Sequence, residues 1–140
     1  MEEKAKILYI IRGLPSSGKT TFARTFNCKH FESDMYFLNT EGEYVFEPLQ
    51  VGKAHIWCKN SVRSAMIEAS KTVDEHKYDR IMVSDVLSQE SEVNSYIDMA
   101  KDHGYYFFSM VVENRHDGDV NPEVTRANME AIHKRFDLKL

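Results

Sequence analysis

This 140-residue sequence has few cysteines and no recognisable pattern of metal ligands. Its two cysteines, Cys28 and Cys58, form no C-x-x-C motif, and its six histidines are scattered without the spacing of metal ligands. This scarcity argues against a disulfide scaffold and against a structural zinc site. We therefore expect both cysteines to be free thiols.

Long apolar runs are also missing. None approaches the roughly 18 consecutive apolar residues that a membrane-spanning helix needs. Residues 1–6 are mixed in charge and lead directly into a strand-like run, which differs from the charged and apolar regions of a secretion signal. We therefore expect a cytoplasmic protein without a membrane partner.

Positive charge is concentrated near the N-terminus. Residues 1–30 carry six Lys or Arg and two Glu, residues 31–50 carry five acids and no Lys or Arg, and the net charge is −4. This pattern argues against a broad basic surface that coats a nucleic-acid duplex. A nucleic-acid substrate would instead be held locally at one end. The length favours one compact domain, which we place at residues 1–140.

Short apolar runs alternate with helical periodicity along the chain. We expect strands at residues 6–12, 29–33, 81–83 and 105–112. We expect helices at about 19–26, 48–76, 90–103 and 122–136, and a small hairpin within the loop 38–47. This order predicts an α/β P-loop NTPase-type three-layer domain, with a parallel sheet of about four strands and helices on both faces. A ligand of such a sheet binds at the carboxyl ends of the strands.

The pattern around which the chain is organised follows the first expected strand. It is the segment Gly13-Leu14-Pro15-Ser16-Ser17-Gly18-Lys19-Thr20, with the Walker A spacing G-x-x-x-x-G-K-[ST]. Glycines let successive backbone N–H groups point into one concavity that holds phosphate oxygens. Lys19 would reach the β- and γ-phosphates, and the Thr20 hydroxyl would bind Mg²⁺. We therefore predict that ATP and Mg²⁺ bind here. The predicted nucleotide-binding residues are Gly13, Pro15, Ser16, Ser17, Gly18, Lys19, Thr20 and Thr21.

Charged residues near other expected strand ends complete the predicted site. Asp85 ends a strand, where a carboxylate holds the Mg²⁺ shell or orients substrate; the alternative is a cap of the next turn. Asp34 ends the second short strand and suits a base that accepts a hydroxyl proton; the alternative is a helix cap or a loop acid. Arg115 lies in the polar loop 114–121, a candidate lid, and Arg126 follows it. Either arginine could bind phosphate or be a solvated surface charge.

Several segments, taken in chain order, match the motifs of one known protein family. They are Pro15-Ser16-Ser17-Gly18-Lys19-Thr20-Thr21-Phe22-Ala23-Arg24, Ser33-Asp34-Met35-Tyr36-Phe37, Ala54-His55-Ile56-Trp57, Ile81-Met82-Val83-Ser84-Asp85 and Asn114-Arg115-His116-Asp117-Gly118-Asp119-Val120. Together they resemble small P-loop kinases related to polynucleotide 5′-hydroxyl kinase, and the resemblance covers most of the chain. It implies a kinase with Asp34 as the general base, Arg115 on a lid, and a nucleic-acid 5′ end as a candidate partner.

The sequence departs from that family at several polar positions. Met35 stands in place of a second acid, and Phe37 stands where members can carry a phosphate-binding arginine. After Asp85 the chain has Val86-Leu87-Ser88 instead of Asn-Thr-Asn. Three functions therefore stay open. They are transfer of the ATP γ-phosphate to a nucleic-acid or nucleotide 5′-hydroxyl, nucleotide binding without catalysis in a regulatory protein, and phosphorylation of a small metabolite or mononucleotide.

Overall fold

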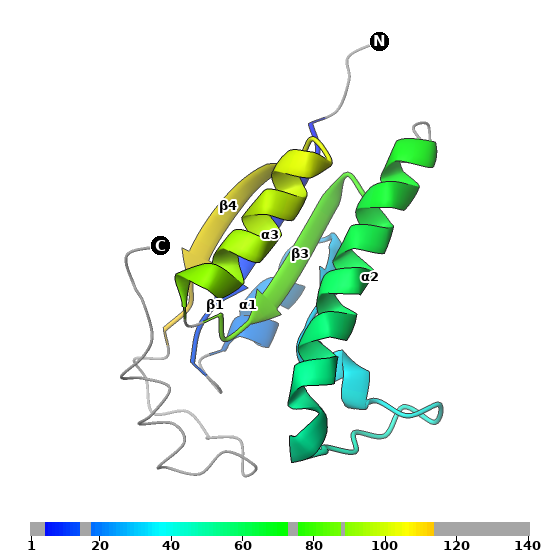
Figure 1. Cartoon of the computed structure of the whole chain (residues 1–140), viewed down its shortest axis with the longest axis vertical. Helices are drawn as coiled ribbons and strands as arrows, with labels where there is room; N and C mark the ends of the chain where they lie inside the picture. Colours follow the sequence, from blue (N-terminus) through cyan, green and yellow to red (C-terminus); the bar gives the residue numbers. More distant parts are fainter. Residues whose placement is uncertain (1–4, 15–17, 73–75, 88, 114–140) are drawn as a thin grey trace.

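The sheet has four parallel strands in the order β2-β3-β1-β4 (Figure 1). This computed structural model describes residues 5–14, 18–72, 76–87 and 89–113. The strands are β1 (Ile7–Arg12), β2 (Lys29–Phe31), β3 (Arg80–Asp85) and β4 (Tyr106–Val111). The predicted parallel sheet is therefore confirmed. In the central pair, Arg12 lies opposite Asp85, so the carboxyl ends of β1 and β3 are level with each other.

The two central strands are buried on both faces. Leu8 and Ile10 point to one face and join a large core cluster, whereas Ile11 and Met82 form a smaller cluster on the other. A strand buried on both faces is apolar at nearly every position, because neither side meets water. This is why the continuous apolar runs of the sequence predict β1 and β3 well.

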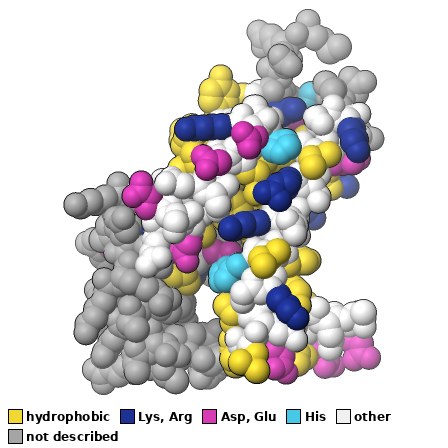
Figure 2. Space-filling view, viewed as in Figure 1, with side chains coloured by type: hydrophobic (Ala, Val, Ile, Leu, Met, Phe, Trp, Pro, Cys, Tyr) yellow, Lys and Arg dark blue, Asp and Glu magenta, His cyan; other side chains and the backbone are white. Residues whose placement is uncertain are grey.

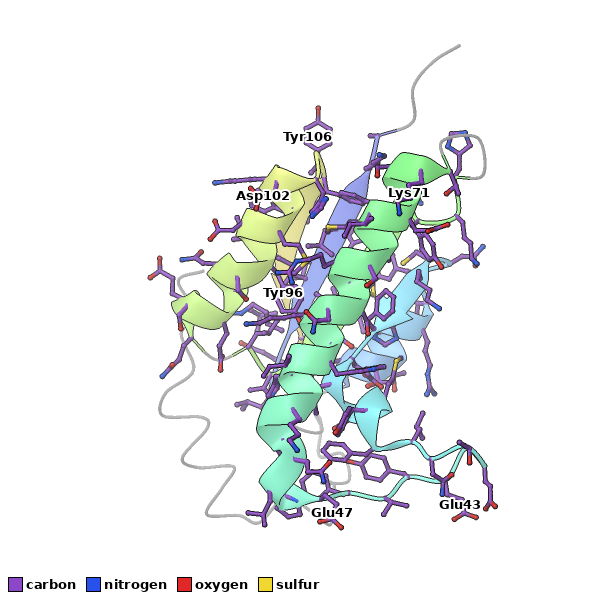
Figure 3. All side chains as sticks on the ribbon, turned by 45° about the vertical axis from the view of Figure 1, so that its right-hand side comes forward. Glu43, Glu47, Lys71, Tyr96, Asp102 and Tyr106 are labelled. Carbon is purple, nitrogen blue, oxygen red and sulfur yellow. The ribbon has the colours of Figure 1, made fainter. Side chains whose placement is uncertain are left out.

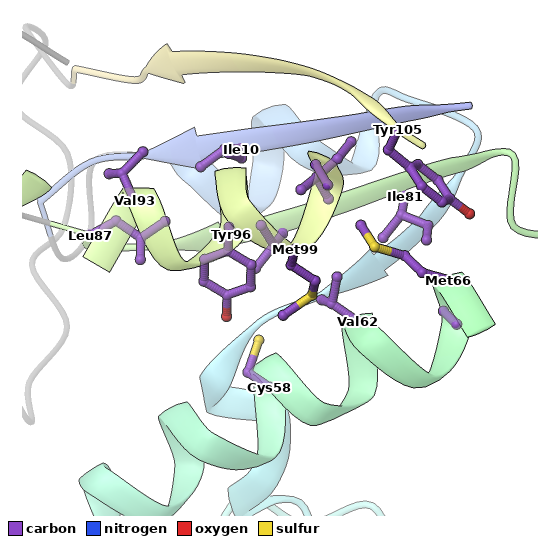
Figure 4. Close-up of a cluster of buried hydrophobic side chains, with 14 of the residues drawn as sticks. Ile10, Cys58, Val62, Met66, Ile81, Leu87, Val93, Tyr96, Met99 and Tyr105 are labelled. Carbon is purple, nitrogen blue, oxygen red and sulfur yellow. The ribbon is translucent and has the colours of Figure 1, made fainter. Parts of the chain in front are cut away.

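Helices cover both faces of the sheet, as predicted. On one face, α2 (Val51–Lys71) and α3 (Glu90–Asp102) pack against the sheet, and their side chains Val62, Val93 and Tyr96 meet in the core (Figure 4). On the other face, the short helix α1 (Lys19–Arg24) contributes Ala23. A capping box at Gln89, in which the Glu92 side chain bonds back to the cap, fixes the start of α3.

The segment after β2 differs from the prediction. The expected strand at 29–33 ends at Phe31, and residues Ser33–Phe37 form a 3₁₀ turn, η1. The physical reason is that the Ser33 backbone N–H donates to the Asp85 side chain at 3.0 Å rather than to a strand ladder. The chain therefore leaves the sheet two residues earlier, and Asp34 lies within η1 instead of ending a strand.

A hairpin-like loop and a second 3₁₀ turn connect η1 to α2. The predicted small hairpin is present, because Leu38 pairs with Tyr44 and Gly42 takes the turn with φ +82°. The predicted helix 48–76 begins as a 3₁₀ turn, η2 (Pro48–Gln50), before α2. Figure 3 shows this loop at the opposite end of α2 from Lys71.

Within the described ranges, no helix combines the length and the apolar character that a bilayer crossing requires. The predicted lid 114–121 and the predicted helix 122–136 lie outside the described residues.

Candidate functional site

The predicted phosphate loop begins where β1 ends and returns to α1. Gly18 precedes α1 with φ +97°, a conformation that glycine adopts without the steric cost of a Cβ atom. At the other end of the loop, the Gly13 N–H donates to the Val86 carbonyl at 3.4 Å. Buried Arg12 donates from Nε to the Leu87 carbonyl at 2.9 Å. These contacts attach the loop to the segment after β3.

Lys19 lies at the start of α1, and its Nζ donates to the Leu14 carbonyl at 3.1 Å. Burial lowers the pKa of Lys19, while the charges of Asp85, Asp34 and Glu32 act in the opposite direction. One lysine therefore stands among three carboxylates. Such a desolvated ammonium group attracts phosphate oxygens strongly, because little water screens its charge.

The Thr20 hydroxyl meets a carboxylate from the end of β2. Thr20 Oγ1 donates to Glu32 Oε2 at 2.9 Å, and Ser84 Oγ donates to the same oxygen at 3.1 Å. His30 Nε2 also contacts Ser84 Oγ. Because the single Ser84 hydroxyl proton is used toward Glu32, the His30 N–H is the donor in that contact. Burial lowers the pKa of His30, although the nearby Glu32 opposes this shift, so the neutral imidazole is favoured.

Asp85 is held by Ser33 rather than open to the loop. Ser33 donates from its backbone N–H to Oδ1 at 3.0 Å and from its hydroxyl to Oδ2 at 2.6 Å. Ser33 Oγ also lies 2.9 Å from His55 Nδ1, which must be the donor because the Ser33 proton goes to Asp85. Burial raises the pKa of Asp85, and these hydrogen bonds oppose that shift. The two residues bind η1 to the end of β3.

Asp34 is accessible to solvent beside this buried pair. Although the residue is exposed, enough protein surrounds its carboxyl group for desolvation to raise its pKa. The Glu32 charge adds to the shift, whereas Lys19, a hydrogen bond from Tyr44 and the His55 charge oppose it. A solvent-accessible carboxylate with a raised pKa is suited to accept a proton from a bound hydroxyl group.

Cys58 lies behind the site in the core. Burial raises the pKa of its thiol to about 12, and both Cys58 and Cys28 are free, as predicted. A buried thiol with this pKa is protonated at neutral pH, so it is chemically inert.

The structure brings together Lys19, Thr20, Asp34 and Asp85, which the sequence nominates. It adds four polar residues that were not predicted as site residues from the sequence: Glu32, Ser33, Ser84 and His55. Glu32 had a usable signal, since it is an acid at the end of an expected strand two residues before Asp34. The hydrogen bonds of Ser33 and Ser84 join residues 52 positions apart, and no local pattern reveals such contacts.

The oxygen atoms around Thr20 fit Mg²⁺ in type. Mg²⁺ prefers oxygen ligands and usually keeps several waters, with one or two carboxylates and the substrate phosphates completing its shell. Hydroxyl and carboxylate oxygens of Thr20 and Glu32 meet this requirement. In the part of the chain that the structure describes, no group of three or more His, Cys, Asp or Glu could hold a metal alone.

The remaining nominated residues divide into two groups. Gly13, Gly18 and Thr21 are described, with Thr21 exposed on α1. The other predicted phosphate-binding residues lie outside the described residues; they are Pro15, Ser16, Ser17, Arg115 and Arg126.

Comparison by sequence finds several similar proteins, including a human one. Human NEDD4-binding protein 2 is 30% identical over 104 residues, which cover 71% of this chain and 5% of that protein. The chain therefore spans a small part of that relative's length. No protein-family profile matches the chain.

Comparison by structure places the fold among kinases. A chain of the Pnkp1/Rnl/Hen1 RNA repair complex aligns with a TM-score of 0.57 and 16% identity, covering 99% of this chain and 48% of that one. Kti12 from Chaetomium thermophilum, in complex with ADP-AlF3, aligns with a TM-score of 0.52, 18% identity and coverage of 93% and 80%. A gluconokinase from Sinorhizobium meliloti 1021 aligns with a TM-score of 0.51, 12% identity and coverage of 98% and 77%. These likenesses confirm the predicted relationship at the level of fold: the chain has the α/β fold of the P-loop kinases.

Proposed function

We propose that this chain is an ATP-dependent phosphotransferase, which moves the γ-phosphate of ATP to a hydroxyl group. The observation that carries the proposal is the hydrogen bond from Thr20 to Glu32, which joins the start of α1, where Lys19 lies, to the segment that carries Asp34. A phosphate-binding lysine and an accessible carboxylate in one site are two parts that transfer to a hydroxyl requires.

Each residue has a defined role in the proposed reaction. Lys19 holds the β- and γ-phosphates, and the Thr20 hydroxyl binds Mg²⁺, which neutralises phosphate charge when present. Asp34 takes the proton of the acceptor hydroxyl as its oxygen bonds to the γ-phosphorus. The bond from that phosphorus to the bridging oxygen breaks, and ADP leaves. From the sequence, Arg115 and Arg126 are proposed to bind phosphate from the lid and just after it.

A nucleic-acid or nucleotide 5′-hydroxyl is the acceptor class that we propose. The face formed by α2 carries four basic residues and one acid, and dark blue side chains lie along this helix in Figure 2. The four are Lys53, Lys59, Arg63 and Lys71. A basic helix that packs on η1, which carries Asp34, can hold the phosphates that follow a 5′ end. The RNA repair complex among the structural neighbours agrees with this choice.

The proposal is tested with γ-labelled ATP and a panel of acceptors: 5′-hydroxyl DNA and RNA oligonucleotides, nucleosides and small polyols. We expect label on an oligonucleotide 5′ end. Asp34→Asn should slow transfer about 10²–10⁴-fold, the usual contribution of a general base, while ATP affinity stays within about threefold. The matched control is Glu43→Gln, which neutralises an acid on the exposed hairpin away from Lys19 and should keep full activity. Unchanged transfer in Asp34→Asn would refute the assigned role.

One structural feature favours a second candidate, a nucleotide-binding regulatory protein without transfer. The two residues that follow Asp85, Val86 and Leu87, are apolar, and Leu87 is buried, so they offer no polar side chain to an acceptor. The same assay separates the candidates. ATP binding without label on any acceptor would support the regulatory protein, and label on a polyol or nucleoside alone would indicate a small-molecule kinase.

A further inference from the structure

Two carboxylates stand close to the predicted metal site, and their surroundings differ. Asp85 occupies the strand end at which a P-loop protein usually places its metal-binding acid. Glu32 comes from the end of β2, immediately before η1. The contacts of each carboxylate show which of the two is available to a cation.

Both oxygens of Asp85 are already used in holding the protein together. Oδ1 accepts the Ser33 backbone N–H at 3.0 Å and Oδ2 accepts the Ser33 hydroxyl at 2.6 Å, and Asp85 is only 8% exposed. A cation that bound Asp85 directly would have to reach this buried carboxylate and would compete with both hydrogen bonds for the electron density of the same oxygens. Any weakening of these bonds would loosen the attachment of η1, which carries Asp34, to the end of β3.

The Glu32 carboxylate instead contacts the predicted metal ligand itself. Its Oε2 accepts the Thr20 hydroxyl at 2.9 Å, and the Ser84 hydroxyl donates to the same atom at 3.1 Å. A hydroxyl group that donates its proton to a carboxylate keeps its lone pairs for a cation. Among the described residues, the hydrogen bonds of Glu32 all involve Oε2, and a carboxylate has a second oxygen that can serve as a metal ligand.

We propose that Glu32, and not Asp85, is the carboxylate on which Mg²⁺ binding depends. Glu32 orients the Thr20 hydroxyl and supplies negative charge to the cation, while Asp85 anchors the segment that carries Asp34. This inference rests on the proposed function, because it concerns the metal that accompanies ATP. It divides two tasks, metal binding and positioning of the base, between two strand ends.

The test measures the metal dependence of nucleotide binding. The dissociation constant of a fluorescent ATP analogue is determined in EDTA and in saturating Mn²⁺, and the ratio of the two constants reports the metal contribution. We expect Glu32→Gln to reduce this ratio about tenfold or more, since metal sites typically lose 10–100-fold in affinity when such a partner is removed. The affinity of Glu32→Gln for the analogue in EDTA should not fall below that of wild type. The matched control is Glu43→Gln, which should keep the wild-type ratio.

Asp85 is tested in parallel with two variants. We expect Asp85→Asn to keep the metal ratio in the folded fraction. If that variant does not fold, Ser33→Ala removes the hydroxyl that donates to Oδ2 and accepts from His55, keeps the backbone contact to Oδ1, and should likewise keep the ratio. A ratio that falls tenfold in Asp85→Asn or Ser33→Ala but not in Glu32→Gln would overturn the inference.

Failure of the inference is distinguishable from failure of the proposed function. Wild-type protein that binds the analogue equally in EDTA and Mn²⁺ would overturn the metal assignment and leave nucleotide binding intact. Wild-type protein that binds no analogue under either condition would overturn the proposed function, and the inference with it.

Discussion

At the scale of single residues, the pKa of Asp34, the proposed base, links the proposed function to stability. Burial raises that pKa above its ordinary value of about 3.8, so the folded protein holds the proton where the unfolded chain has released it. Stability therefore falls as pH rises through the folded pKa. Asp34→Asn carries no charge and escapes this loss.

We expect Asp34→Asn to melt at a higher temperature than wild type near pH 7. The gain should shrink as pH falls, and it should vanish once Asp34 is protonated in both states. Thermal unfolding of the two proteins, followed by circular dichroism from pH 3 to 7, measures the difference. A Tm difference that does not vary with pH would show that Asp34 is not desolvated.

The predictable residues of the site are those that a local motif names. Lys19 and Thr20 follow from the spacing of a loop, and Asp34 follows from a short segment after a strand. Glu32 and His55 act through contacts with Thr20 and Ser33 that only folding creates, since the two pairs are separated by 12 and 22 positions. A pattern read along the chain holds no information on which hydroxyl a carboxylate will meet.

At the scale of elements, the contact between η1 and β3 sets the position of Asp34. Ser33→Ala removes the hydroxyl that donates to Asp85 Oδ2 and accepts from His55 Nδ1, and it leaves a buried Asp85 oxygen without that donor. An unsatisfied buried polar group costs about 1–3 kcal/mol, so we expect the free energy of unfolding to fall by about this amount. Urea denaturation measures the loss.

A double-mutant cycle with Asp85→Asn isolates this pair. If the two groups act through each other, the combined loss should differ from the sum of the single losses by at least about 0.5 kcal/mol. Strictly additive losses would mean that Ser33 stabilises the protein through other contacts.

The elements themselves differ in how well the sequence predicts them. β1 and β3 are predictable because burial on both faces demands continuous apolar runs, and α3 is predictable from its periodicity and its end at Gly104. η1 is not, because a side chain from another strand replaces the ladder partner of Ser33. A hydrogen bond from outside the element decides its boundary there.

At the scale of the whole molecule, the parallel order of the strands gathers the site at one edge of the sheet. Residues from β1, β2, β3 and α1 meet there, so a bound nucleotide would connect several elements at once. A ligand that binds only the folded state stabilises it by about 2.7 kcal/mol when present at about 100 times its dissociation constant. For a chain of this size, we expect ATP with Mg²⁺ to raise Tm by several degrees.

Lys19→Ala separates this effect from general stabilisation. Burial lowers the pKa of Lys19, which means that its charged form is less stable in the folded protein than in water. Removal of this side chain should therefore leave the Tm without ligand at or above that of wild type. The shift with ATP and Mg²⁺ should then fall to less than a third, since the phosphate-binding cation is lost. Lys71→Ala, at the distant end of α2, should keep the full shift (Figure 3). An equal shift in Lys19→Ala and wild type would place nucleotide binding elsewhere on the molecule.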